Sequence, residues 1–202
     1  MRLEVRCVTS ACQLVKPTSG RLGAAAFVTT VEKAQQALAL WRELSDKYWE
    51  ASTLHLIGRA YSSGGKYDQA IEYYGRALTI RREVKDRAGE GNTLNNLALA
   101  HRSLNRQEKA IEYHEPALAI KRELKDTPGE ADALNNLGRA YVSLNRYEKA
   151  IEYFEQALAI AREVKDQLRE ADPLYLLGYA YSSLSRSEKA LEYSEQALVI
   201  YG

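Results

Sequence analysis

The 202-residue chain contains few cysteines, few histidines and almost no excess of charge. Its two cysteines, Cys7 and Cys12, lie near the N-terminus, where they could form a local disulfide or supply two metal ligands. Two ordinary thiols are the favoured interpretation, because no second Cys or His pair follows at metal-site spacing. The three histidines (His55, His101 and His114) are scattered along the chain. We therefore predict no metal site and no cofactor.

Long hydrophobic runs are also missing. No run approaches the roughly 18 apolar residues of a membrane span, and the best candidate, residues 22–28, is too short and too far along the chain for a signal peptide. Lys and Arg number 28 against 27 Asp and Glu, a formal net charge of +1. A general nucleic-acid binder usually shows a basic excess or stripe. We expect a cytoplasmic protein that binds neither membranes nor nucleic acid.

Motifs that carry chemistry are equally absent. The sequence has no Gly-rich phosphate loop after a strand, no Ser/His/Asp order with supporting context and no paired-carboxylate motif. Glu and Lys are abundant, but segments such as 148–153 place them at the spacing of solvated helix surfaces with i,i+4 pairs. We therefore predict that the chain is not an enzyme.

What the sequence does contain is a repeat with a period of 40 residues. The segments that begin at Gly89 and Gly129 align without a gap and are identical at about two-thirds of their positions. The same frame predicts repeats at 49–88, 89–128, 129–168 and 169–202, the last one truncated, and a half repeat at 27–48. Residues 1–26 are atypical and are expected either to cap the array over Trp41 or to be disordered.

Each repeat is predicted to form two amphipathic helices. In the repeat 129–168, Leu134, Leu137, Gly138 and Tyr141 recur at i, i+3, i+4 and i+7, which is one face of a helix. The breaks between paired helices fall on residues that tolerate a left-handed backbone, namely Gly65, Asn105, Asn145 and Ser185. The predicted caps of the next helix are Asp86, Asp126 and Asp166, with Thr127 and Glu130 as a capping box.

A single helix pair cannot cover its own apolar face, but stacked pairs can. We therefore predict an all-α fold, a right-handed α-solenoid of stacked antiparallel helix pairs. Its last repeat is expected to leave an apolar stacking face uncovered, which either continues into further sequence or drives self-association.

The repeated residues resemble the signature of the tetratricopeptide repeat family. That family's common unit has about 34 residues, whereas the 40-residue unit here is similar to those of Pins-type polarity adaptors, kinesin light chains and many bacterial signalling proteins. The residues that carry the resemblance in the repeat 129–168 are Leu134, Leu137, Gly138, Tyr141, Ala150, Phe154 and Ala157. The resemblance covers residues 27–202 and is far more specific for fold than for function.

The resemblance implies that a partner binds along an inner, concave surface formed by the first helix of each repeat. Helical geometry predicts which residues line this groove: His55, Arg59, Asn92, Asn95, Asn96, Leu99, Arg102, Asp132, Asn135, Asn136, Arg139, Val142, Tyr175, Leu176 and Tyr179.

Two features of the predicted groove are unusual. The Asn pairs 95–96 and 135–136 resemble the asparagine ladder of kinesin light chains, whose amides bind a peptide backbone; the alternative is that they are solvated and were copied with the repeat. In the last repeat Tyr175, Leu176 and Tyr179 replace these polar residues. They form either an anchor pocket for a partner side chain or a contact with further sequence.

One specificity of the family can be excluded. The carboxylate clamp that holds the acidic tails of heat-shock proteins requires lysines, and the matching positions here lack them. Those positions are His55, Arg59, Asn96, Asp132 and Asn136 in one frame, and Asn95, Leu99, Asn136, Asp172 and Leu176 in the next.

The second repeat is irregular, since His101 and His114 replace aromatic residues and Pro116 falls inside the predicted second helix. Sequence drift tolerated by strong neighbours is the favoured explanation, and a hinge or pH-sensitive joint is the alternative.

These observations favour a non-catalytic scaffold or adaptor in signalling, which binds a partner peptide or helix in the groove. The alternative is the sensor portion of a larger bacterial signalling ATPase or protease. RNA reading by helical repeats ranks last, because the groove is not basic.

Overall fold

The computed structural model describes residues 24–201, so the predictions for Cys7, Cys12 and the segment before residue 24 lie outside the described residues. The chain divides into two compact units, Met1–Leu104 and Asn105–Gly202. Unit 1 contains α2 (Ala24–Glu43), α3 (Lys47–Ser63), α4 (Tyr67–Glu83) and α5 (Arg87–Ser103). Unit 2 contains α6 (Gln107–Glu123), α7 (Thr127–Ser143), α8 (Tyr147–Glu163), α9 (Gln167–Ser183) and α10 (Ser187–Tyr201).

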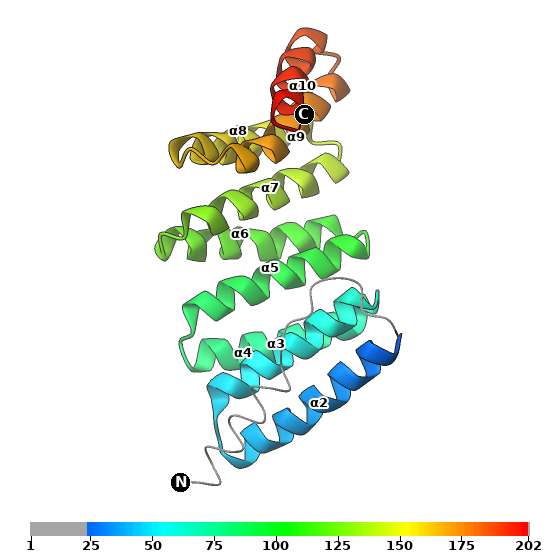
Figure 1. Cartoon of the computed structure of the whole chain (residues 1–202), viewed down its shortest axis with the longest axis vertical. Helices are drawn as coiled ribbons and strands as arrows, with labels where there is room; N and C mark the ends of the chain where they lie inside the picture. The colour runs from blue at the N-terminus through cyan, green and yellow to red at the C-terminus, as the bar shows by residue number, and fades with distance from the viewer. Residues whose placement is uncertain (1–23, 202) are drawn as a thin grey trace. The chain divides into compact units, whose positions relative to one another are not determined.

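The predicted all-α repeat fold is confirmed over the described residues. Within each unit, consecutive helices pack side by side as antiparallel neighbours (Figure 1). The first helices of the repeats begin at Lys47, Arg87, Thr127 and Gln167, so the 40-residue period of the sequence is also the period of the structure. Each pair starts two residues before the repeat boundary predicted from the sequence.

The first helices share one capping arrangement. Asp46, Asp86, Asp126 and Asp166 each precede a first helix, and each side chain accepts a hydrogen bond from the backbone N–H three residues later. The three aspartates predicted as caps therefore have that role, but the predicted capping box of Thr127 is wrong. Because Asp126 already occupies the cap position, Thr127 is the first helical residue, and the Glu130 carboxylate accepts from Arg122 instead.

The turns within repeats adopt the left-handed backbone that the sequence predicts, with φ of 73° at Gly65, 58° at Asn105, 55° at Asn145 and 57° at Ser185. A second series was missed. The turns between repeats also have a residue with φ between 54° and 58°, although these residues are Ser45, Lys85, Lys125 and Lys165. A lysine gives no signal for this conformation in a sequence.

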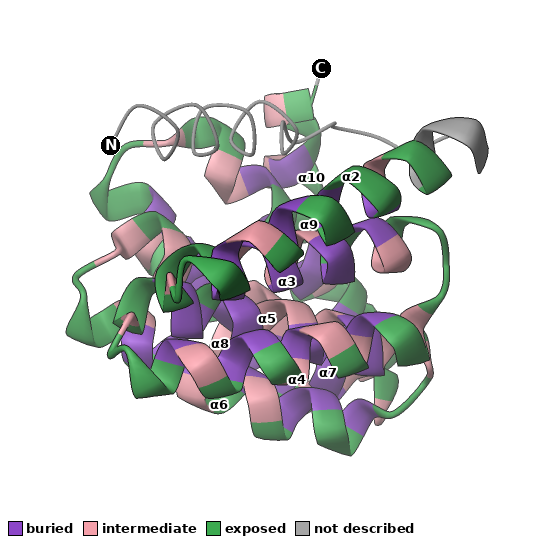
Figure 2. Ribbon diagram, turned by 90° about the horizontal axis from the view of Figure 1, so that it is seen from below, coloured by how far each residue is buried: buried purple, intermediate pink, exposed green. Residues whose placement is uncertain are grey.

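The core of each unit lies between its stacked helices, where buried residues recur along α2 to α9, whereas Ala197 is the one buried residue of α10 (Figure 2). In unit 2, Leu134, Leu137 and Phe154 are fully buried in one apolar cluster. Gly138 allows a close approach of α7 and α8, because a Cβ at this position would overlap the Phe154 ring. Gly58 has the same relation to Tyr74 in unit 1, where a Cβ would lie 2.6 Å from the ring.

A repeated ion pair links each second helix to the next first helix. Nε of Arg42, Arg82 and Arg122 lies 2.7–2.8 Å from a carboxylate oxygen of Glu50, Glu90 and Glu130, and the Arg162–Glu170 distance is 3.4 Å. Partial burial raises the pKa of Glu90, but hydrogen bonds and the charges of Arg82 and Arg87 outweigh it and hold that pKa below its usual value.

Two departures from the repeat pattern are accommodated within the fold. Helix α6 continues through Pro116, and α9 continues through Pro173.

The expected uncovered apolar face is present on α10, where Leu191 and Leu198 are 61% and 70% exposed. Their counterparts in α8, Ile151 and Leu158, are buried in the core of unit 2.

Candidate functional site: the first-helix walls

The residues predicted to line a groove lie on the first helices of both units. We call the set on α3 and α5 the unit 1 wall: His55, Arg59, Asn92, Asn95, Asn96, Leu99 and Arg102. The set on α7 and α9 is the unit 2 wall: Asp132, Asn135, Asn136, Arg139, Val142, Tyr175 and Tyr179. All of these residues are exposed or half-buried.

One predicted residue does not belong to an exposed wall. Leu176 is only 6% exposed and is part of the apolar cluster of unit 2. The expected patch of Tyr175, Leu176 and Tyr179 therefore presents its two tyrosines, while the aliphatic side chain packs inward. The matching residue in α7, Asn136, is half-buried. Where leucine replaces this asparagine in α9, the side chain joins the apolar core instead of remaining in contact with solvent.

In the unit 1 wall, His55 and Asn96 join two successive first helices. The Thr93 hydroxyl donates to the carbonyl of Gly89 at 2.9 Å, so its oxygen accepts from Nδ1 of His55 at 3.1 Å. The amide of Asn96 lies 3.0 Å from Nε2 of the same ring. Because the Thr93 hydroxyl already donates its proton to Gly89, it can only accept from His55. A neutral His55 therefore has its proton on Nδ1, and its Nε2 accepts from the Asn96 amide.

The electrostatic surroundings of His55 favour its neutral form. Desolvation, with the positive charges of Arg81 and Arg59, lowers the pKa of His55 to about 3. Its ring also packs against Tyr74 at 5.3 Å between centroids. Asn96 is therefore more than a solvated amide, because its side chain holds α5 to α3.

The unit 2 wall is crossed by ion pairs between α7 and α9. Arg139 Nη2 lies 3.2 Å from Asp172, and Arg169 Nη1 lies 3.0 Å from Asp132. Arg169 also contacts Asp166 at 3.1 Å. Both arginines are thus paired with carboxylates, and the two arginines and three aspartates of these ion pairs together have a formal charge of −1.

Exposed tyrosines lie on α9 after Asp172, the α9 residue that pairs with Arg139. Tyr175 and Tyr179 are 58% and 49% exposed, and they are one helical turn apart on the same face. Tyr201 of α10 adds a third exposed ring, whose hydroxyl lies 3.4 Å from the Asp172 carboxylate.

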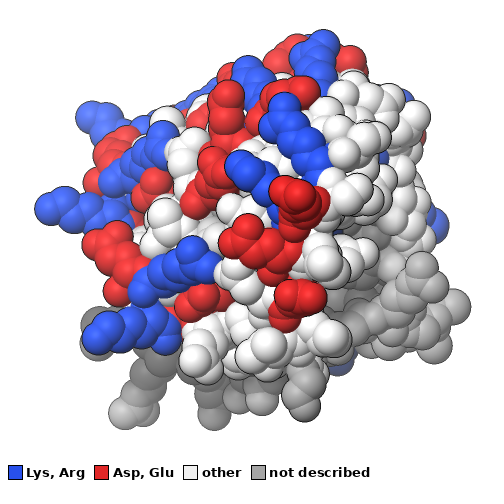
Figure 3. All heavy atoms as spheres, turned by 90° about the horizontal axis from the view of Figure 1, so that it is seen from above, with Lys and Arg blue, Asp and Glu red and all other residues white. Residues whose placement is uncertain are grey.

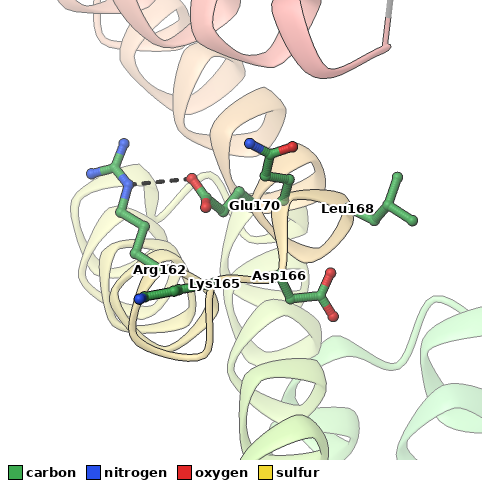
Figure 4. A pocket seen from close by; sticks show the side chains of 6 residues that line it. Arg162, Lys165, Asp166, Leu168 and Glu170 are labelled. Atoms are coloured by element: carbon green, nitrogen blue, oxygen red, sulfur yellow. Dashed lines mark hydrogen bonds and ion pairs between the residues drawn. The ribbon is translucent and has the colours of Figure 1, made fainter.

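The surface of unit 2 has an open hollow of about 590 Å³ at the turn between α8 and α9. Arg162 contacts Glu170 in this hollow (Figure 4). Arg162 also donates to Gln196 at 2.8 Å. Leu168 points away from this ion pair. On the face shown in Figure 3, Lys and Arg are interspersed with Asp and Glu and form no patch of a single sign. The hollow is open and its lining is mostly charged, unlike the enclosed and mostly apolar pockets that bind small molecules.

Among residues 24–201, no group of three or more His, Cys, Asp or Glu side chains could hold a metal ion. None of the helices in that range is long and apolar enough to cross a membrane. The chemistry that the walls offer is hydrogen bonding from amides, ion pairing and aromatic contact.

Comparison with known families identifies the repeat. The tetratricopeptide repeat pattern matches residues 30–83, 63–123, 89–163 and 129–201, which together cover most of the chain. The chain belongs to the tetratricopeptide repeat family. Members of this family are generally protein-interaction modules, because stacked repeats leave an extended surface available for a partner. No curated protein matches the sequence.

Solved structures of this family share the fold at low sequence identity. A Podosopora anserina protein described as a kinesin light chain, with nearly identical TPR-like repeats, is 20% identical at a TM-score of 0.75, with 99% of this chain and 95% of that chain covered. A Rap protein complexed with Competence and Sporulation Factor is 22% identical at a TM-score of 0.71, over 86% of this chain and 48% of that chain.

A third similar structure is a signal transduction ATPase with numerous domains from Pyrococcus horikoshii, which has a tetratricopeptide repeat sensor. It is 22% identical at a TM-score of 0.80, and the match covers 87% of this chain and 27% of that chain. At this identity the three structures support the fold alone.

The sequence did not reveal three participants in the walls: Thr93, Arg169 and Tyr201. Thr93 looks like a core residue from its spacing and is fully buried, yet its hydroxyl orients His55. Arg169 lies in the first turn of α9 and pairs with a residue 37 positions away. No local pattern could have indicated these contacts, since each joins neighbouring repeats or helices.

Proposed function

We propose that the chain is a non-catalytic adaptor that binds an extended segment of a partner protein along its first-helix walls. The observation that carries this proposal is the distribution of burial. The apolar faces of the stacked helices are used within each unit, whereas the positions of His55, Asn95, Asn135 and Tyr175, which match in successive first helices, keep polar or aromatic side chains in contact with solvent.

The unit 1 wall supports this proposal through its amides and its rigidity. Asn95 and Asn96 are half-buried on α5, and Asn92 and Arg59 of the same wall are exposed. An amide both donates and accepts, so it can pair with a peptide backbone whatever the peptide sequence. Because His55 fixes Asn96, less side-chain entropy is lost when a ligand binds.

The similar structures add support of a general kind. A Rap protein with the same fold is complexed with Competence and Sporulation Factor. Transfer of a ligand-binding role to this chain is part of the proposal, because the two share the fold at 22% identity.

A random peptide library displayed on phage tests the proposal. The full chain would be immobilised and enriched peptides synthesised for titration. Arg59→Ala on the unit 1 wall should weaken binding of peptides that use this wall. Arg76→Ala is the matched control, because Arg76 is equally an exposed arginine but belongs to the second helix α4. We expect the control to bind like the wild type.

Two results would overturn the proposal. One is the failure of the library to yield any peptide with saturable binding. The other is a set of peptides whose binding is lost in Arg76→Ala and kept in wall variants. Circular dichroism of each variant separates a binding defect from unfolding.

A second candidate function is the sensor portion of a larger signalling enzyme. The observation that favours it is the ATPase from Pyrococcus horikoshii, in which a repeat sensor of the same fold is one part of a much longer chain. The sequence of the full-length gene distinguishes the two functions, because a nucleotide-binding or protease domain on the same chain would favour the sensor.

A further inference from the structure

Unit 2 has an arrangement that unit 1 lacks: an exposed carboxylate, Asp172, with Tyr201 beside it and two further exposed tyrosines along α9. Tyr175 and Tyr179 are one turn apart on α9, and Asp172 lies on the same helix one turn before Tyr175. Tyr201 of α10 places its hydroxyl 3.4 Å from Asp172. Partial burial, followed by the Asp172 charge and a smaller effect of Tyr175, raises the pKa of Tyr201, which is consistent with the proximity of the three groups.

We propose that Tyr175, Tyr201 and Asp172, with Tyr179 one turn further along α9, form a site for a cationic side chain, the arginine or lysine of a partner segment. Aromatic ring faces attract cations through their quadrupole, and a neighbouring carboxylate adds charge attraction. This inference rests on the proposed function, since it names the side chain that the unit 2 wall recognises.

The charge balance of the wall favours a cation over an anion. Arg169 is held between Asp132 and Asp166, and Arg139 is held by Asp172. Three carboxylates therefore face two guanidinium groups, so an incoming anion would meet paired arginines and an excess of negative charge. The Asp172 carboxylate is 58% exposed and has lone pairs beyond those used by Arg139 and Tyr201.

The exposure of the tyrosines is unusual for their fold positions. In α7 the matching residues are Asn135 and Arg139, and in α5 they are Asn95 and Leu99, all of them half-buried. Only α9 places two aromatic rings at these positions among the described first helices. An apolar partner side chain would also contact the rings, but it would leave the adjacent carboxylate without a new partner.

Peptides enriched from the random library provide the test, with the full chain as target. The proposal predicts a lysine or arginine at one fixed position of the peptides whose binding depends on unit 2. Tyr175→Leu keeps an apolar surface but removes the ring, and should weaken these peptides by about 5- to 30-fold. Tyr175→Phe keeps the ring and should bind nearly as the wild type.

Asp172→Asn should weaken the same peptides and reduce the salt dependence of their binding. The control is Tyr48→Leu, because Tyr48 is 53% exposed but lies at the start of α3 in unit 1. Exchange of the basic residue of the peptide for its uncharged isostere, such as citrulline for arginine, should have the same effect as Asp172→Asn, and the two changes should not be additive.

Each other outcome contradicts the proposal. Peptides that bind the unit 2 wall through an apolar residue and tolerate Tyr175→Leu would show an apolar anchor, with the adaptor function retained. Enrichment of acidic peptides that depend on Arg139 would show an anion site. A library that yields no ligand at all would overturn the adaptor function itself.

Discussion

Acid should destabilise the wild-type chain more than a variant that lacks the His55 imidazole. In the unfolded chain a histidine has a pKa of about 6.5, whereas the folded structure lowers the pKa of His55 to about 3. Between these values the unfolded state binds a proton that the folded state does not. The contribution of His55 to stability is therefore fully present above about pH 6.5 and is lost progressively as the pH falls towards 3.

The magnitude follows from the same shift. Each pH unit below the unfolded pKa removes about 1.4 kcal/mol, so a change from about pH 7 to about pH 5 removes about 2 kcal/mol in the fully desolvated limit. His55 is half-buried, and its residual contact with solvent reduces this to about 1–2 kcal/mol. The network with Thr93 and Asn96 supplies the physical reason, because a neutral Nε2 is needed to accept from the Asn96 amide.

Urea denaturation of the wild type and of His55→Gln at both pH values measures this effect. Subtracting the free energies of unfolding of the two proteins at each pH removes the contribution of titrating residues that both contain. These include Glu50 and Glu90, both of which have lowered pKa values. Nitrogen-15 NMR of the imidazole provides a second reading, and it should show a neutral ring protonated at Nδ1. Parallel pH profiles for the two proteins, or a His55 that titrates near its unperturbed value, would show that His55 is not held neutral by the fold.

Three further predictions concern stability and assembly. Gly138→Ala should destabilise unit 2 by about 1–3 kcal/mol in thermal denaturation, because the new methyl group overlaps the Phe154 ring; an unchanged melting temperature would contradict the close packing. Asp126→Ala should cost about 1 kcal/mol through loss of the cap, whereas Thr127→Ala should cost much less, and the reverse order in urea melts would restore the capping box. The exposed face of α10 should promote self-association at high concentration, which Leu198→Glu should reduce; light scattering that shows a strict monomer throughout would count against it.

The fold could be predicted from the sequence because its determinants are local and repeated. The apolar spacing around Leu134 and Leu137, the aspartate caps and the left-handed turn residues each need only a few neighbouring positions. Repetition at 40 residues then fixes the stacking, since every pair presents the same faces. The left-handed Lys85 escaped prediction because its conformation is imposed by the helices on either side.

The candidate site was less predictable because its contacts join residues about one repeat apart. Helical geometry correctly placed Asn96 on a first helix away from the core stripe, but the bond to His55, 41 positions away, depends on how α3 and α5 pack. Likewise, Leu176 occupies a position that is polar in α7. Whether such a residue faces solvent or joins the core depends on how the neighbouring helices pack against it, which sequence spacing does not specify.

Site-specific photocrosslinking would show whether a bound peptide lies on the first-helix walls. Benzoyl-phenylalanine would replace Leu99 on the unit 1 wall in one protein and the exposed Thr79 on the second helix α4 in another. With a peptide whose binding depends on Arg59, we expect the benzoyl-phenylalanine at position 99 to crosslink to the peptide and the one at position 79 to give no product. A product from position 79, with position 99 silent, would show that partners bind elsewhere and would contradict the account.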